Sequence, residues 1–456
     1  MKVFSRSLRW PSRAIIPFLI LGFASPSGAG ERLVLGLSQL IRMAVEKSPE
    51  IAEAQSEVAG AKSDLAQADA ASYPQFDTTT LVGPVNDARR PQVAGTRIID
   101  PSAEFAVGAF GRTDMTLTQP LYTFGKLSNR RHAAARGVAA AEAKLPRKRG
   151  EIALRVKELY YGLVLARVGI EAAEDAAVYF DEARRRIDRL LEGGSQNVIE
   201  SDLYRIDAYR ADTIRSQAEA EKGVRTAYFA LKEIVGLADG ADFDPADKML
   251  SAGGVGPTDL EECVRKALSD RPDFLQLEQA LQAQKWSVEG ALSDRYPSFF
   301  AALGGSFAGA PGRETLHNHY IPDQFNHAGG GVVGGMLWHF DFGILKARVD
   351  KERANYERLI HTKEMAKLGI PIEVAQRYYE ANQWRATADA YDHAASSARK
   401  WIVAALTSFD MGVGTADDML RGIERYGQRR GKYLEALFEY NMSLARLEYA
   451  MGVESW

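Results

Sequence analysis

The 456-residue sequence contains one cysteine, Cys263, and only seven histidines. A single cysteine excludes an intramolecular disulfide and a cysteine-based zinc cage. Lysine and arginine (57) nearly balance aspartate and glutamate (60), so the chain lacks the strong positive charge of a general nucleic-acid binder. With 46% hydrophobic residues, the chain is too apolar to be intrinsically disordered. The composition therefore indicates a folded protein that does not bind nucleic acid.

Sequence motifs of enzymes are also missing. Neither the zinc-protease pattern H-E-x-x-H nor the nucleophile pattern G-x-S-x-G occurs, and the Gly-Lys pairs at 125 and 431 lack the other residues of a P-loop. The glycines of residues 329–334 fit G-x-G-x-x-G, but a strand-like segment follows them where a dinucleotide site needs a helix. We expect a glycine-rich strand there, no catalytic site and no cofactor.

Three of the histidines, His317, His319 and His327, fall in one expected loop. Imidazoles at this spacing can bind zinc, copper or nickel. Histidines of a solvated loop more often bind no metal. We therefore predict no metal site and treat the three residues only as candidates.

Long apolar runs are absent except at the N-terminus, where residues 14–23 follow four cations and precede the small residues 27–29. This order predicts a cleaved secretory signal peptide over residues 1–29. The run is about ten residues, half of what a membrane-spanning helix needs. No later stretch approaches 18 apolar residues, so we expect an exported chain that could enter a membrane only as β-strands.

The remaining chain repeats one pattern. Residues 37–74 align without a gap on residues 260–297, and both segments end in Tyr-Pro. We therefore predict two half-repeats, 30–250 and 251–456, joined by the Gly- and Asp-rich segment 238–256.

Each half has the same order of segments. A helix, expected at 38–71 and 261–294, ends at Tyr-Pro because the residue before proline is forced out of the helical conformation. A β-hairpin follows, and then a long helix, a glycine turn and a returning helix. The expected hairpins are at about 76–122 and 299–340, and the expected helical hairpins are 126–236 and 344–452.

The long helices determine the architecture. An outgoing helix of 67 residues would be roughly 100 Å long, which is too long for an ordinary globular core. Apolar residues three and four apart, such as Val156, Leu159, Tyr160 and Leu163, predict lateral coiled-coil-like packing. Pro146 and Pro371 predict bends within these helices.

Two hairpins supply only four strands, whereas the smallest transmembrane barrels have about eight. Unpaired strand edges in hydrocarbon would leave several backbone groups unsatisfied. If the strands lie in a membrane, several chains must share one barrel, and the long helices then surround a common axis. The alternative is a soluble helical protein with two hairpins.

The chain resembles the TolC-like outer membrane efflux protein family in this order of segments. The resemblance rests on Ser48-Pro49, Tyr73-Pro74, QPLYTFG (119–125), LWHFDFG (337–343), GVGT (412–415) and Tyr440-Asn441. No single motif is specific, but their order is repeated and covers nearly the whole mature chain.

The resemblance implies a mainly α fold with β, in which three chains of four strands close a 12-stranded outer-membrane β-barrel above a coiled-coil-like helical tunnel. It implies a passive exit duct of a tripartite efflux or type I secretion system in the outer membrane of a Gram-negative bacterium. The implied partners are two further copies forming a homotrimer, a periplasmic adaptor (membrane fusion) protein, an inner-membrane transporter and outer-membrane lipid. The residues alone leave open a soluble periplasmic scaffold that binds protein partners, or an exported hydrolase.

The resemblance also places the closed end of the tunnel at the two helical turns, whose tips are Gly193, Gly194, Gly412 and Gly414. Arg421 stands where the family pattern has a further acidic residue, which argues against a strongly cation-selective constriction. Charged residues at a helix start also serve as caps or as a solvated face, and this is the alternative role. The candidate gate residues are Glu200, Asp202, Asp417, Asp418 and Arg421, with Arg205 nearby.

The same comparison marks the junctions between helices and strands. The helix-to-strand transitions are expected at Tyr73, Pro74, Tyr296 and Pro297, and the strand-to-helix transitions at Gly125 and Gly343.

Overall fold

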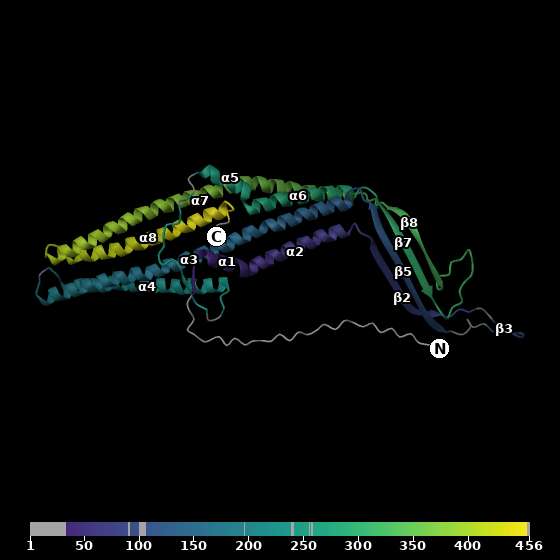
Figure 1. The fold of residues 1–456 in the computed structure, drawn as a ribbon, viewed down its shortest axis with the longest axis horizontal. Coiled ribbons are helices and arrows are strands. Elements are labelled where there is room, and N and C mark those ends of the chain that lie inside the picture. The colour runs from purple at the N-terminus through teal and green to yellow at the C-terminus, as the bar shows by residue number, and fades with distance from the viewer. Residues whose placement is uncertain are drawn as a thin grey trace, which may run out of the picture.

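The structure is a computed structural model, and it describes residues 33–89, 92–99, 106–195, 197–238, 241–254, 256 and 259–453. The predicted signal peptide lies outside these residues. Long helices lie side by side along the molecule, and a sheet extends from one end of them (Figure 1). The predicted architecture, mainly helical with four principal strands, is confirmed.

The first helical segment of each half is two helices. Helix α1 (Leu37–Lys47) is followed by α2 (Pro49–Ala70), and α5 (Leu260–Asp270) by α6 (Pro272–Ser293). The prediction of one continuous helix was wrong, because a proline begins the second helix and holds the preceding residue extended. Ser48, for example, has φ −65° and ψ 124°.

Four strands form one antiparallel sheet in the order β2-β5-β7-β8. Strand β8 ends before the predicted residue 340, and His327 is its first residue rather than part of the loop. The ladder between β5 and β7 is irregular at Pro120, which has no N–H to donate. The strand bounds are β2 (Gln75–Asn86), β5 (Val107–Tyr122), β7 (Ser298–Gly309) and β8 (His327–Leu337).

The loop after β2 contains a small antiparallel hairpin, β3 (Gln92–Ala94) with β4 (Arg97–Ile99). In the principal sheet, β2 and β8 each pair on one side only, so among the described residues both edges of this sheet are open.

Side chains alternate between the two faces of the sheet, as the period of a strand requires. According to the strand register, one face carries Phe76, Val82, Met115, Leu117, Leu303, Phe307 and Val332. The other carries Asp77, Arg112, Asp114, Ser306 and His327. The charged side chains of the sheet therefore lie on one face, which also carries Leu81, Phe110 and Val333, whereas the other face has no charged residue.

Two helical hairpins make up the rest of the length. Helix α3 (Lys126–Glu192) turns into α4 (Glu200–Val235), and α7 (Ile344–Asp410) turns into α8 (Ala416–Ala450). Both outgoing helices have 67 residues and continue through Pro146 and Pro371 without ending. Helix α3 packs against α4 and α8, so the order of helices across the molecule is α4-α3-α8-α7 (Figure 1).

The core lies along the seams between these helices. Val156, Tyr160 and Leu163 of α3 are completely buried there, as their spacing predicted. A second cluster fills the space between the helices near the turns, and a third joins α5 to α7 and α8. None of the described helices combines the length and hydropathy that crossing a membrane requires.

The segment between the halves is tied to the helices. It contains β6 (Phe243–Pro245), which pairs in parallel with β1 (Leu33–Leu35). Tyr160 donates to Asp247 Oδ2 at 2.7 Å, and Arg167 forms an ion pair with Asp244 at 2.8 Å. The sequence had indicated a linker here but no strands.

Candidate functional site

The two helical turns lie together at the end of the molecule away from the sheet (Figure 1). Gly194 and Gly412 have φ of +70° and +76°, a left-handed conformation that glycine adopts without steric cost. A Cβ on Gly414 would lie 2.8 Å from the backbone nitrogen of Phe409. Asn197 Nδ2 donates to Gly412 O at 3.3 Å and links the two turns directly.

Asp417 lies between two arginines behind these turns. Its Oδ1 is 2.8 Å from Nη1 of Arg205 on α4, and its Oδ2 is 2.9 Å from Nε of Arg421 on its own helix. The Arg205 pair joins the two helical hairpins of the chain. Within one chain, the negative charge of Asp417 is therefore balanced by neighbouring cations.

Asp202 is only 6% exposed and belongs to the same cluster. Its Oδ2 accepts a hydrogen bond from Ile199 N at 3.1 Å, and its Oδ1 is 3.6 Å from Arg205. The side chain thus binds a backbone N–H at the start of α4, the capping role that charged residues at a helix start often have.

Asp418 and Glu200 have separate partners. Asp418 N donates to Thr415 Oγ1 at 3.1 Å, and Asp418 Oδ1 accepts from Trp401 Nε1 at 3.2 Å. Glu200 accepts a hydrogen bond from the Tyr204 hydroxyl at 3.1 Å, which raises the pKa of that tyrosine. The structure thus brings Asp202, Arg205, Asp417 and Arg421 together and leaves the other two candidates outside this cluster.

Sequence reasoning missed a second set of ion pairs near the turns. Arg186 contacts Asp410 at 3.4 Å, Arg210 contacts Asp181 at 3.3 Å, and Arg184 pairs with Asp207. The arginine-rich segment 184–189 was the available signal. These cations make the end of the helices a balanced charge network and not an acidic one.

An apolar cluster lies next to this network. Phe180 stacks on Tyr209 with ring centroids 5.8 Å apart. Burial, together with Glu424, raises the pKa of Tyr209. The fully buried members of the cluster are Ala183, Ile187, Ile206, Met419, Leu420, Ile402 and Ile423.

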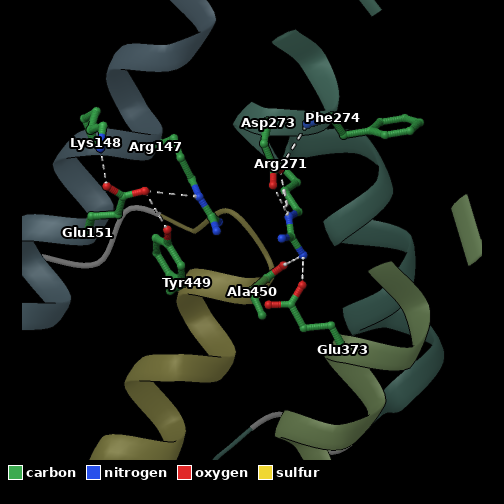
Figure 2. Close-up of polar contacts among 9 residues, drawn as sticks. All are labelled: Arg147, Lys148, Glu151, Arg271, Asp273, Phe274, Glu373, Tyr449 and Ala450. Carbon is green, nitrogen blue, oxygen red and sulfur yellow. Dashed lines mark hydrogen bonds and ion pairs between the residues drawn. The ribbon is translucent and has the colours of Figure 1, made fainter. Parts of the chain in front are cut away.

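The opposite end of α8 is held by a polar cluster, shown in Figure 2. Arg271, 6% exposed, binds Asp273 at 2.8 Å and Glu373 of α7 at 2.6 Å, and it reaches the carbonyl of Ala450 at 3.5 Å. Burial alone would lower the pKa of Arg271, but its hydrogen bonds to Asp273 and Glu373 outweigh burial and raise it. The C-terminal end of α8 is therefore bound to α6 and α7.

Tyr449, next in the chain to Ala450, binds α3 in the same cluster (Figure 2). Its hydroxyl donates to Glu151 Oε1 at 3.2 Å, and the Arg147 guanidinium lies 3.8 Å from the centre of its ring. Lys148 binds the other Glu151 oxygen at 2.8 Å. Burial raises the pKa of Tyr449. Contacts on both sides thus fix this end of α8 far from the turns.

Exposed aromatic residues gather where helices meet strands. Phe124 stacks on Tyr296 at 5.4 Å, and Trp338 lies 4.4 Å from Phe340. Gly125, with φ +91°, begins α3 in a left-handed conformation. We call this group the aromatic belt: Tyr73, Phe76, Tyr122, Phe124, Tyr296, Phe299, Trp338, Phe340 and Phe342.

The three candidate histidines do not converge. His327 Nε2 lies 2.9 Å from Ser306 Oγ in the sheet, whereas His317 Nδ1 lies 3.0 Å from the carbonyl oxygen of Thr315 in the loop. Among the described residues, no group of three or more His, Cys, Asp or Glu side chains is arranged to hold a metal ion.

Comparison with known proteins adds a family and a fold. The family model described as outer membrane efflux protein matches residues 40–237 and 263–453. Three similar solved structures are CusC (18% identity, 92% of each chain covered, TM-score 0.75), the MtrE outer membrane channel of Neisseria gonorrhoeae (17%, 91% of this chain and 89% of that one, 0.73) and the outer membrane protein VceC of Vibrio cholerae (17%, 91% and 96%, 0.70). No curated protein sequence matches the chain. At these identities the solved structures establish a shared fold.

Proposed function

The chain belongs to the outer membrane efflux protein family and is an outer-membrane exit duct, and we propose that it acts as a homotrimer that is closed at its helical turns. The observation that carries the proposal is the four-stranded sheet with two open edges, which continues directly into helices of 67 residues. We further propose that the chain consists of the half-repeats 30–250 and 251–456, and that it has no catalytic role.

The open edges support a trimer. Strands β2 and β8 each leave one row of backbone groups without a partner among the described residues, which is costly in a membrane. Three copies paired β2 to β8 would close the sheet at twelve strands. Strands of 11 to 16 residues are long enough for a bilayer crossing, which needs roughly 9–11. The face without charged residues would then contact lipid and the face with the charged residues would line the duct.

The outer helix α7 supports the same assembly. Met365, Leu368 and Ile372 lie three and four residues apart and are 65%, 71% and 67% exposed. Such a stripe is the pattern of a helix packed along one face against another helix. In the proposed trimer, this exposed stripe packs against a helix of the next copy.

We propose that the turns form the periplasmic gate. The Arg205–Asp417 pair holds the two helical hairpins of each chain together at this end, whereas the Arg271 and Tyr449 contacts hold the other end of α8. Opening would separate the hairpins near the turns and break the exposed pair. Exposed pairs contribute only about 0.2–1 kcal/mol each, so a docking partner could break them.

The proposed partners follow from the chemistry that the chain lacks. The sequence contains no nucleotide-binding motif, so an inner-membrane transporter would supply the energy. A periplasmic adaptor would dock at the turns and open them. We propose export of small molecules, and secretion of a protein through the same duct is the alternative.

Membrane fractionation tests this function. The chain, expressed with its signal segment in a Gram-negative host, should be found in the outer membrane. In mild detergent it should have about three chain masses and conduct ions across a planar bilayer. A water-soluble monomer in the periplasm would contradict the proposal and favour the scaffold.

A further inference from the structure

Cations without acidic partners lie directly beside the aromatic belt, at the ends of the strands that join the helices. We propose that Lys126, Arg295 and Lys346 bind the phosphate groups of anionic phospholipids in the periplasmic leaflet of the outer membrane. This inference rests on the proposed function, because it requires the sheet to lie in the bilayer with the belt at its periplasmic surface.

Two carboxylates of this region are already paired with other cations. Asp69 pairs with Arg131 at 2.5 Å, and Asp294 pairs with Arg348 at 3.1 Å. Asp341 accepts hydrogen bonds from the backbone of Gly343 and Leu345 at the start of α7. Asp69 and Asp294 are therefore neutralised by other arginines, whereas Asp341 binds backbone N–H groups and keeps its negative charge at the helix start.

Three other cations remain available. Arg295 and Lys346 are exposed, and neither has an acidic partner within ion-pair distance in the part of the chain that the structure describes. Lys126 Nζ donates to a neutral group, Ser298 Oγ, at 3.1 Å, and it too has no acidic partner among the described residues. All are close to the belt in sequence: Arg295 precedes Tyr296, and Lys126 follows Phe124 by two residues.

Contacts between the belt and these residues make the surface continuous. The indole of Trp338 donates to the carbonyl of Arg295 at 3.0 Å, and Phe124 stacks on Tyr296 beside it. Aromatic side chains of this kind lie at the headgroup level of a membrane, where lysine and arginine extend to the phosphates. The belt therefore places the three cations at the depth of the phosphate layer.

The charge of the region differs from that of the chain. The whole chain carries a net charge of −3, yet this surface presents three cations that have no acidic partner among the described residues. Three copies would place nine such cations around the duct. Basic residues at a membrane surface attract anionic lipid, and each strengthens binding about fivefold. The helices join the sheet on the periplasmic side, so the ligand is a phospholipid of that leaflet.

Native mass spectrometry of the trimer in detergent tests the inference, with phosphatidylglycerol and phosphatidylcholine as probes. The wild type should prefer phosphatidylglycerol, and Arg295→Gln with Lys346→Gln should weaken this preference about fivefold for each cation removed. Added salt should reduce the preference, because it screens charges at a surface.

The matched control is Arg265→Gln with Lys266→Gln, which removes one arginine and one lysine that are exposed on α5, away from the sheet. The control should keep the wild-type preference. Arg295→Lys with Lys346→Arg should also keep it, since the charges remain. This variant therefore distinguishes an effect of lost charge from an effect of altered folding.

Three outcomes overturn the inference. A trimer that binds both lipids equally refutes it and leaves the proposed function intact, and so does an equal loss of preference in the control. If the chain forms no trimer in the outer membrane, the proposed function fails first and this inference fails with it.

Discussion

Replacing Asp417 with asparagine should shift the duct towards its open state. The change removes the charge between Arg205 and Arg421, whose nitrogens lie 2.8 and 2.9 Å from the two carboxylate oxygens. The Arg205 and Asp417 side chains are 38% and 39% exposed, so the pair contributes at most about 1 kcal/mol. The pair with Arg421, four residues away on one helix, adds about 0.3–0.5 kcal/mol.

The effect should multiply across the assembly. A loss of about 1 kcal/mol in each of three chains gives about 3 kcal/mol if the turns open together, or roughly a 100-fold shift between closed and open forms. The two arginines, left without Asp417 between them, also repel each other.

Planar-bilayer recording measures this shift as a higher open probability of single trimers. Asp389→Asn is the matched control, because Asp389 is an exposed acid of α7 away from the turns. The control should behave as the wild type. If Asp417→Asn trimers have the same low open probability as the control, the role of this pair is refuted. If both variants show the same increase in open probability, the increase is a general effect of lost charge.

Two further predictions concern stability. Arg271→Gln removes the buried cation that Asp273 and Glu373 share and should destabilise the protein by about 1.5–3 kcal/mol, the contribution of a hydrogen bond to a charged group, because both acids are partly exposed and can be solvated. The loss should be seen as a lower temperature of thermal unfolding, whereas the exposed Arg265→Gln should change little. A wild-type unfolding temperature in Arg271→Gln would contradict the role of the buried cluster. The Arg155 hydrogen bond lowers the pKa of Glu50 below its ordinary value of 4.5, so its contribution to stability is complete above that value and is lost as the pH falls through the lower, folded pKa. Unfolding followed from pH 6 to pH 3 should therefore show a weaker acid dependence in Glu50→Gln than in the wild type, and identical dependence would refute this contribution.

Much of the architecture could be predicted because it depends on long, regular patterns. A run without helix-breaking turns between Gly125 and Gly193 indicated a helix of 67 residues, and α3 has this length. Residues at helical spacing, such as Val156 and Tyr160, indicated the buried seam. Segments rich in Thr, Phe, Gly and Val indicated the strands of the sheet.

Short or non-local features could not be predicted in the same way. Strands β1 and β6 have three residues each, too few to show a period, and they pair across about 200 residues of chain. The break at Ser48 was missed although the same rule about proline was applied at Tyr73. That error came from reading the apolar spacing as continuous.

The candidate site could be predicted from the sequence only in part, for a related reason. The acids at 200, 202, 417 and 418 could be recognised by position, but their partners come from other helices. Arg205 meets Asp417 across 212 residues, and Arg271 meets Glu373 across 102. Such pairings depend on how the helices pack, and the spacing of residues along one helix contains no information about them.

Cysteine cross-linking across the sheet edges tests the trimer most directly. In a Cys263→Ala background, one cysteine is placed in β2, at Thr78 or Thr80, and one in β8, at Ala328 or Val332, and the outer membranes are oxidised. Pairing of β2 with β8 of the next copy predicts covalent dimers and trimers on a denaturing gel, with no larger species. Monomers alone, for every combination of positions, would contradict the closed trimer.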